Sequence, residues 1–156
     1  MHYGIDASNL RSGGGMHHLL RILENSGDNP GGDMQITVWG NAALCDRVPR
    51  TEGVTLTVVP ELDAPPLRRM VWQMRQLPEL ARNVCDVLFA PGGLAGKHSV
   101  PTVVMCRNML PFELSEARRY GATYMFARLL FLRLLQTRTF RRADGVVFLS
   151  DYARER

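Results

Sequence analysis

Lysine is almost missing from this chain. Lys97 is the only lysine among 19 basic residues in 156, so arginine supplies nearly all of the excess that gives a net charge of +4. The planar guanidinium group binds phosphate and carboxylate through paired hydrogen bonds, and the excess therefore fits phosphorylated ligands or anionic surfaces. A high-GC genome would produce the same composition, and composition alone leaves both explanations open.

Cysteine is scarce and irregularly spaced. Cys45, Cys85 and Cys106 are odd in number and form no CxxC pair. This pattern argues against a disulfide framework and against a cysteine zinc site. We expect reduced, mostly buried thiols.

Long apolar runs are also missing. No basic segment followed by an apolar run opens the chain, and the longest apolar region, residues 125–135, is interrupted by Arg128 and Arg133. A membrane-spanning helix needs about 20 apolar residues. The expectation is a cytoplasmic protein in which residues 1–156 form a single domain.

A glycine triplet, Gly13, Gly14 and Gly15, lies between a short apolar run, residues 2–5, and a helical segment, residues 15–26. It lacks the G-x-G-x-x-G spacing of a dinucleotide site and the lysine of a phosphate-binding P-loop. A strand, a glycine turn and a helix start are nevertheless where a parallel sheet holds phosphate. A plain turn is the alternative, and the position after the first strand favours phosphate.

Strand-like and helical segments alternate along the chain. This order predicts an α/β fold with a Rossmann-like, doubly wound, mostly parallel sheet of about six strands. The third strand should lie near an edge, because it carries threonine on one face. The predicted strands are residues 2–5, 35–40, 54–59, 86–90, 100–106 and 146–149. The later helices are residues 67–84, divided near Gln76 by Pro78, and a long helix from about Glu116 or Tyr120 to Arg142.

The long helix is apolar at every position of residues 125–135 except Arg128 and Arg133. This predicts a core helix that is buried on most sides. A peripheral membrane contact is the alternative, with arginines on lipid phosphates and leucines inserted. We expect no nucleic-acid binding, because no basic face with stacking aromatic residues is visible.

Three loops should open at the carboxyl edge of the sheet, where such folds bind ligands. They are residues 11–15, residues 91–98 with Gly92 and Gly93, and residues 107–113. Arg107 and Asn108 follow an apolar strand directly, as ligand-contacting residues often do. Alternatively, Asn108 caps its own turn, and Glu113 serves the start of the long helix.

The spacing of the histidines does not indicate a metal-binding site. His17 and His18 are adjacent, so they point about 100° apart on a helix and cannot share one metal ion. We expect one of them to be half-buried at the helix start. His98 is most simply a solvated loop residue.

Taken together, these segments make the chain resemble the N-terminal half of a retaining GT-B glycosyltransferase, from the large group that uses nucleotide sugars. Each motif alone is weak, whereas the ordered set covers nearly the whole chain. The matching segments are residues 3–7, 13–15, 86–91, 107–112 and 142–150.

The resemblance implies an enzyme with two Rossmann-like domains facing each other across a cleft. Gly13, Gly14 and Gly15 would approach the donor diphosphate. The acceptor, a sugar, lipid-linked or small molecule, would lie near the other loops, at Arg107, Asn108, Gly92, Gly93 and Glu113. The nucleotide-sugar donor is a substrate, no cofactor or metal is implied, and a C-terminal domain outside these residues would hold most of the donor. The 156 residues alone should therefore not turn over.

One position departs from the family pattern. Many relatives carry His-Asp where this chain has Arg107 and Asn108. Arginine cannot act as a base, because its pKa exceeds about 12, but it can hold a phosphate or a sugar hydroxyl. Two other functions stay open, a non-enzymatic binding or assembly domain and half of a sugar-nucleotide epimerase.

Overall fold

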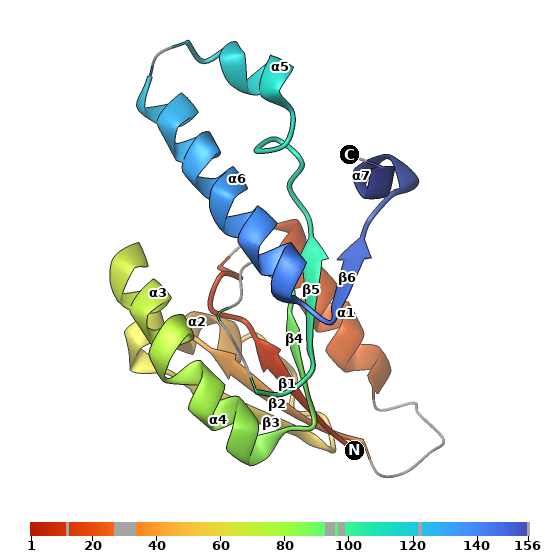
Figure 1. Ribbon diagram of the computed structural model, residues 1–156. Helices are drawn as coiled ribbons and strands as arrows, with labels where there is room; N and C mark the ends of the chain where they lie inside the picture. Colours follow the sequence, from red (N-terminus) through yellow and green to blue (C-terminus); the bar gives the residue numbers. More distant parts are fainter. Residues whose placement is uncertain (12, 27–33, 93–95, 97–98, 122, 156) are drawn as a thin grey trace.

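The computed structural model describes the chain except residues 12, 27–33, 93–95, 97–98, 122 and 156. Six strands form one sheet in the order β3-β2-β1-β4-β5-β6, and every pair of neighbours is parallel (Figure 1). The predicted doubly wound α/β fold is confirmed, with β3 at an edge. The strands are β1 (His2–Asp6), β2 (Gln35–Gly40), β3 (Val54–Val58), β4 (Val87–Ala90), β5 (Thr102–Cys106) and β6 (Gly145–Phe148).

Helical segments join the strands. Because parallel neighbours need a crossover between them, each long connection returns the chain to the same end of the sheet. The helical segments are α1 (Gly14–Ser26), α2 (Ala42–Cys45), η1 (Pro60–Leu62), α3 (Pro66–Arg75), α4 (Leu77–Val84), α5 (Leu114–Arg118), α6 (Tyr124–Arg142) and α7 (Asp151–Glu155).

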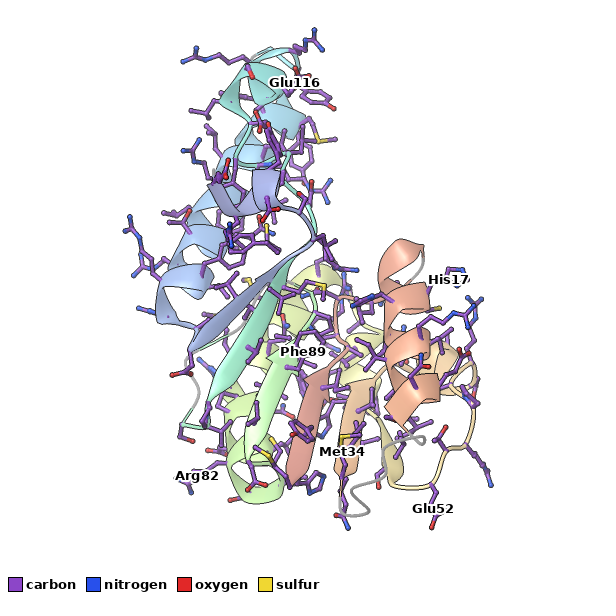
Figure 2. All side chains as sticks on the ribbon, turned by 90° about the vertical axis from the view of Figure 1, so that its right-hand side faces the viewer. His17, Met34, Glu52, Arg82, Phe89 and Glu116 are labelled. Atoms are coloured by element: carbon purple, nitrogen blue, oxygen red, sulfur yellow. The ribbon has the colours of Figure 1, made fainter. Side chains whose placement is uncertain are left out.

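The core lies on both faces of the sheet. Neighbouring side chains on a strand point to opposite faces, so Val38 of β2 packs in the cluster under α1 while Trp39 packs with Trp72 of α3. Figure 2 shows the first of these faces, with α1 beside the labelled Phe89 of β4. Leu77 and Ala81 of α4 complete the second cluster.

The predicted division of the second helical region is confirmed. α3 ends at Arg75 and α4 begins at Leu77, with Gln76 between them. Pro78 lies in the first turn of α4, where its missing N–H leaves no intrahelical hydrogen bond unmade.

The prediction of one long helix was wrong in part. α5 ends at Arg118 and α6 begins only at Tyr124. Gly121 lies between them with a φ of 59°, a left-handed conformation that an α-helix cannot accommodate. The chain therefore turns at Gly121, and Figure 1 shows α5 and the first turns of α6 at the far end of the molecule from the N-terminus.

The prediction that the long helix is buried on most sides was also wrong. Leu130, Phe131 and Leu134 are exposed, whereas Leu129 is the one leucine of α6 that is fully buried. The apolar run was correctly located on a helix. Its composition could not show that only one side of the helix meets the rest of the protein.

Candidate functional site

The glycine turn forms the start of α1. Gly13 has a φ of 71°, and its carbonyl oxygen accepts hydrogen bonds from the N–H groups of Met16, at 3.1 Å, and His17, at 3.3 Å. A Cβ atom on Gly14 would meet no atom within 4 Å. The turn is therefore open toward solvent. It stands at the N-terminal end of α1, where the first N–H groups of a helix have no intrahelical acceptors.

Arg107 lies against this turn. A Cβ built on Gly15 would stand only 1.5 Å from Nη1 of Arg107 and 2.7 Å from its Cζ, so the guanidinium occupies the space that a side chain at residue 15 would need. β1 and β5 are separated in the sheet by β4. The structure therefore brings together two of the predicted strand-end loops at the carboxyl edge.

The loop after β4 joins them at the same edge. A Cβ atom on Gly92 would lie 2.8 Å from Cβ of Asn9, in the loop after β1. Nδ2 of Asn9 is itself buried and has no hydrogen-bond partner among the described residues. Gly93 and His98, which were also predicted for this loop, lie outside the described residues.

A buried carboxyl group at the end of β1 accepts hydrogen bonds from α3 and from the loop that leads to the turn. Asp6, at the end of β1, is 2% exposed, and it accepts hydrogen bonds from Nε2 of Gln73 at 2.5 Å and from the N–H of Ser8 at 3.0 Å. Burial raises the pKa of Asp6 above its ordinary value, although the hydrogen bonds from Ser8 and Gln73 partly oppose the rise. α3 is thereby tied to the end of the first strand.

Cationic groups gather around the turn. Arg11 donates to the carbonyl oxygen of Leu62 at 2.7 Å. Burial, and next the charge of Arg11, lower the pKa of Arg69 on α3, and burial lowers the pKa of Arg107. Nε of Arg69 and Nε of Arg107 are both buried without a hydrogen-bond partner in the described part of the chain. Guanidinium groups held in this way favour a bound anion.

Comparison with known proteins gives no relative. The chain matches no family model, no curated protein and no solved structure. Function must therefore be argued from the geometry of these residues.

The other two predicted residues have contacts of their own. Oδ1 of Asn108 accepts a hydrogen bond from the N–H of Leu110 at 3.1 Å, which is the capping interaction considered as the alternative. Glu113, just before α5, accepts a hydrogen bond from the hydroxyl of Tyr152 on α7. This bond links the loop after β5 to α7.

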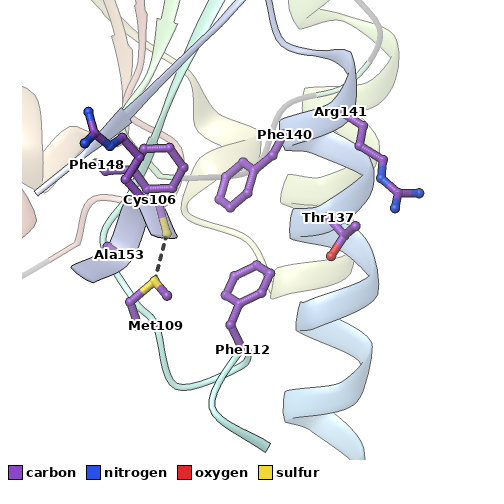
Figure 3. A pocket seen from close by; sticks show the side chains of 9 residues that line it. Cys106, Met109, Phe112, Thr137, Phe140, Arg141, Phe148 and Ala153 are labelled. Atoms are coloured by element: carbon purple, nitrogen blue, oxygen red, sulfur yellow. Dashed lines mark hydrogen bonds between the residues drawn. The ribbon is translucent and has the colours of Figure 1, made fainter. Parts of the chain in front are cut away.

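An aromatic cavity of about 260 Å³ lies behind that link (Figure 3). The rings of Phe112 and Phe140 stack with centroids 5.8 Å apart, and Phe148 meets Phe140 edge-on at 6.4 Å. Sγ of Cys106, beside Phe148 in Figure 3, donates to Sδ of Met109 at 3.5 Å. The cavity was not predicted, because its phenylalanines are far apart in the sequence.

The described residues contain no cluster of three or more histidine, cysteine or acidic side chains that could hold a metal ion. His17 is exposed and His18 is half-buried on α1, as predicted. Among the helices described, none is both long enough and apolar enough to cross a membrane.

Three residues of the site, Asp6, Gln73 and Arg69, were not predicted from the sequence. Asp6 carried a usable signal, because an acidic residue directly follows the apolar end of the first strand. Gln73 and Arg69 carried none, since only the folding of α3 over the sheet brings them to the turn.

Proposed function

We propose that this chain is the acceptor-side domain of a retaining glycosyltransferase that uses a nucleotide sugar, with a second domain holding the nucleoside. The observation that carries the proposal is the contact between Arg107 and Gly15, which sets a guanidinium group against the start of α1. A diphosphate is the ligand that suits both groups, because helix N–H groups and guanidinium each bind phosphate oxygens.

The proposed reaction transfers one sugar. The bond between C1 of the sugar and the diphosphate oxygen breaks, a bond from C1 to an acceptor hydroxyl oxygen forms on the same face, and the acceptor proton leaves with the diphosphate. Negative charge grows on the departing diphosphate. Arg107 and the start of α1 would stabilise that charge, and stabilisation of this kind often dominates enzymatic rate enhancement.

The remaining predicted residues would serve the acceptor. Gly92 brings the loop after β4 close to Asn9, and Asn108 and Glu113 shape the loop after β5. No cofactor or metal is part of the proposal, and the reaction would take place in the cytoplasm. The acceptor is a sugar, lipid-linked or small molecule.

Gly14 offers the sharpest test in an enzyme that joins this chain to its nucleotide-sugar domain. Gly14→Val places a branched side chain where nothing lies within 4 Å, so the fold should survive while the approach of a diphosphate is blocked. We expect transfer to fall about a hundredfold or more. Ala42→Val, at the exposed start of α2, is the matched control and should leave transfer unchanged.

Retained transfer in Gly14→Val would contradict the assignment, and so would tight binding of a nucleotide sugar to the 156 residues alone. Full transfer activity of the joined enzyme with Arg107→Ala and Asn108→Ala would favour a non-enzymatic role for this domain, in binding or assembly. An isomerised sugar released without any acceptor would indicate an epimerase instead.

A further inference from the structure

α6 lacks the polar outer side of an ordinary surface helix. Its side toward the protein buries Leu129 but also the polar Gln136 and Thr139, and Oε1 of Gln136 has no hydrogen-bond partner among the described residues. Its solvent side carries Phe131, 53% exposed, and Leu134, 56% exposed. A helix on a globular protein normally turns its apolar stripe to the core. The exposed apolar side of α6 would therefore be more stable in contact with an apolar environment outside this domain.

The exposed apolar residues share one face. Tyr124, Ala127, Phe131 and Leu134 recur at intervals of three and four, which places them along one side of the helix, and Leu130 borders them. We call these five residues the outer face of α6. Tyr124 is 82% exposed, and Arg138 continues the same line toward the C-terminal end.

The basic excess of the chain is concentrated in the same region. Residues 114–142 contain seven arginines and one acidic residue, Glu116, so this segment carries +6 while the whole chain carries +4. The rest of the chain is slightly acidic. The arginines are Arg118, Arg119, Arg128, Arg133, Arg138, Arg141 and Arg142.

The shape of the molecule leaves this region accessible. Figure 1 shows α5 and the N-terminal half of α6 extending past the end of the sheet as a projecting pair. Tyr120 and Tyr124, both exposed, precede and follow Gly121 in the chain. A projecting tip can enter a fluid surface without the sheet obstructing it.

We propose that the outer face of α6, with the exposed arginines of α5 and α6, binds the surface of an anionic membrane. Arg133 is not among them, because it is half-buried and its Nη1 is a buried atom. Apolar side chains of such a helix enter the boundary between headgroups and acyl chains, while arginines contact lipid phosphates. Tyrosine is favoured at that boundary because one end of its ring is polar. This binding does not depend on sugar transfer, since neither Gly15 nor Arg107 takes part.

The test is vesicle flotation of the 156-residue chain. Vesicles of phosphatidylcholine with about one third phosphatidylglycerol should carry the chain upward, whereas pure phosphatidylcholine vesicles should not, because the anionic surface attracts arginine. Raising the salt concentration to about 1 M should release most of the bound chain by screening. Absence of flotation with anionic vesicles overturns the proposal.

Substitutions on exposed positions locate the contact. Phe131→Ser with Leu134→Ser should weaken vesicle binding about tenfold or more, and Arg128→Gln with Arg138→Gln about fivefold for each charge removed. Leu80→Ser with Arg82→Gln is the matched control, because both residues are exposed on α4. Figure 2 shows Arg82 at the opposite end of the molecule from Glu116 of α5, so this variant should change nothing.

Two results would overturn the proposal after a positive flotation. One is undiminished binding by the Phe131→Ser, Leu134→Ser chain. The other is a stable dimer in sedimentation that these substitutions dissociate, with no loss of vesicle binding, because the outer face would then serve a protein contact. Circular dichroism of each variant checks that the fold is retained.

Discussion

The guanidinium group of Arg107 occupies the space beside Gly15, where a Cβ atom would lie 1.5 Å from Nη1. The end of β5 and the start of α1 are therefore fitted to each other, although 92 positions separate the two residues in the sequence. Any side chain at residue 15 must displace the arginine. Gly14, one position earlier, meets no such neighbour.

This contact predicts coupling between residues 15 and 107. Gly14→Ala should stabilise the chain by about 0.5–1 kcal/mol, because alanine loses less backbone freedom than glycine in a helix. Gly15→Ala should bring a smaller gain or a loss, since Arg107 has to move. In an Arg107→Ala background most of the gain should return, since only Cδ2 of Leu10, at 3.0 Å, then stands close to the new Cβ atom. The coupling free energy should be about 0.5–3 kcal/mol. Urea unfolding of the four chains measures it.

Additive free energies for Gly15→Ala and Arg107→Ala would show that the two residues do not touch. Gly14→Ala with Arg107→Ala serves as the matched cycle. That pair should be additive within about 0.5 kcal/mol, because Gly14 has open space around it.

Much of the fold follows from local patterns. Each predicted strand is present with its ends shifted by at most two residues, since short β-branched runs bounded by glycine or proline leave little choice. The helix break near Gln76 was predictable because Pro78 cannot continue a helix. The break at Gly121 was not, because a single glycine inside a helical pattern is often tolerated.

The candidate site was predictable only in outline. Parallel topology places all carboxyl ends at one edge, so the meeting of residues 13–15 with Arg107 could be expected. The contact of Gln73 with Asp6 could not, because it depends on how α3 crosses the sheet. The exposure of Phe131 was hidden for a similar reason: an apolar composition does not reveal which sides of a helix are covered.

The buried carboxyl of Asp6 predicts a pH dependence of stability. Its pKa is raised by burial in the folded chain, so the folded state binds the proton more tightly than the unfolded state. The free energy of unfolding should therefore fall as the pH rises from the ordinary pKa of 3.8 through the raised pKa, by at most about 1.4 kcal/mol per pH unit, and then level off.

The difference between the native chain and Asp6→Asn isolates this contribution. Urea unfolding of both chains between pH 4 and about pH 8 should show the fall only when Asp6 is present. Parallel pH profiles for the two chains would mean that the Asp6 proton is not linked to folding.

The close packing around Gly4, on the other side of the sheet, leaves no room for a side chain at this position. A Cβ atom at this position would stand 2.7 Å from Sγ of Cys85 and 2.7 Å from Cζ3 of Trp39, both of them buried. Gly4→Ala should therefore destabilise the chain by about 1–3 kcal/mol, as overpacking does. Gly145→Ala is the matched control in β6, because its Cβ would meet Val103 at an ordinary 3.5 Å. Equal thermal midpoints for the two variants would contradict the packing argument.

The three thiols predict an order of alkylation. Cys45 is half-buried, whereas Cys85 and Cys106 are buried, and burial is the main reason why the pKa of each thiol is raised. Because the thiolate is the reactive form, iodoacetamide at pH 7.5 should modify Cys45 first, although more slowly than a free thiol. Cys106 should react only when the chain opens, since it is 2% exposed. Peptide mass spectrometry after timed quenching measures each rate, and urea should make the three rates equal. If native Cys106 reacted as fast as Cys45, Cys106 would not be buried in solution.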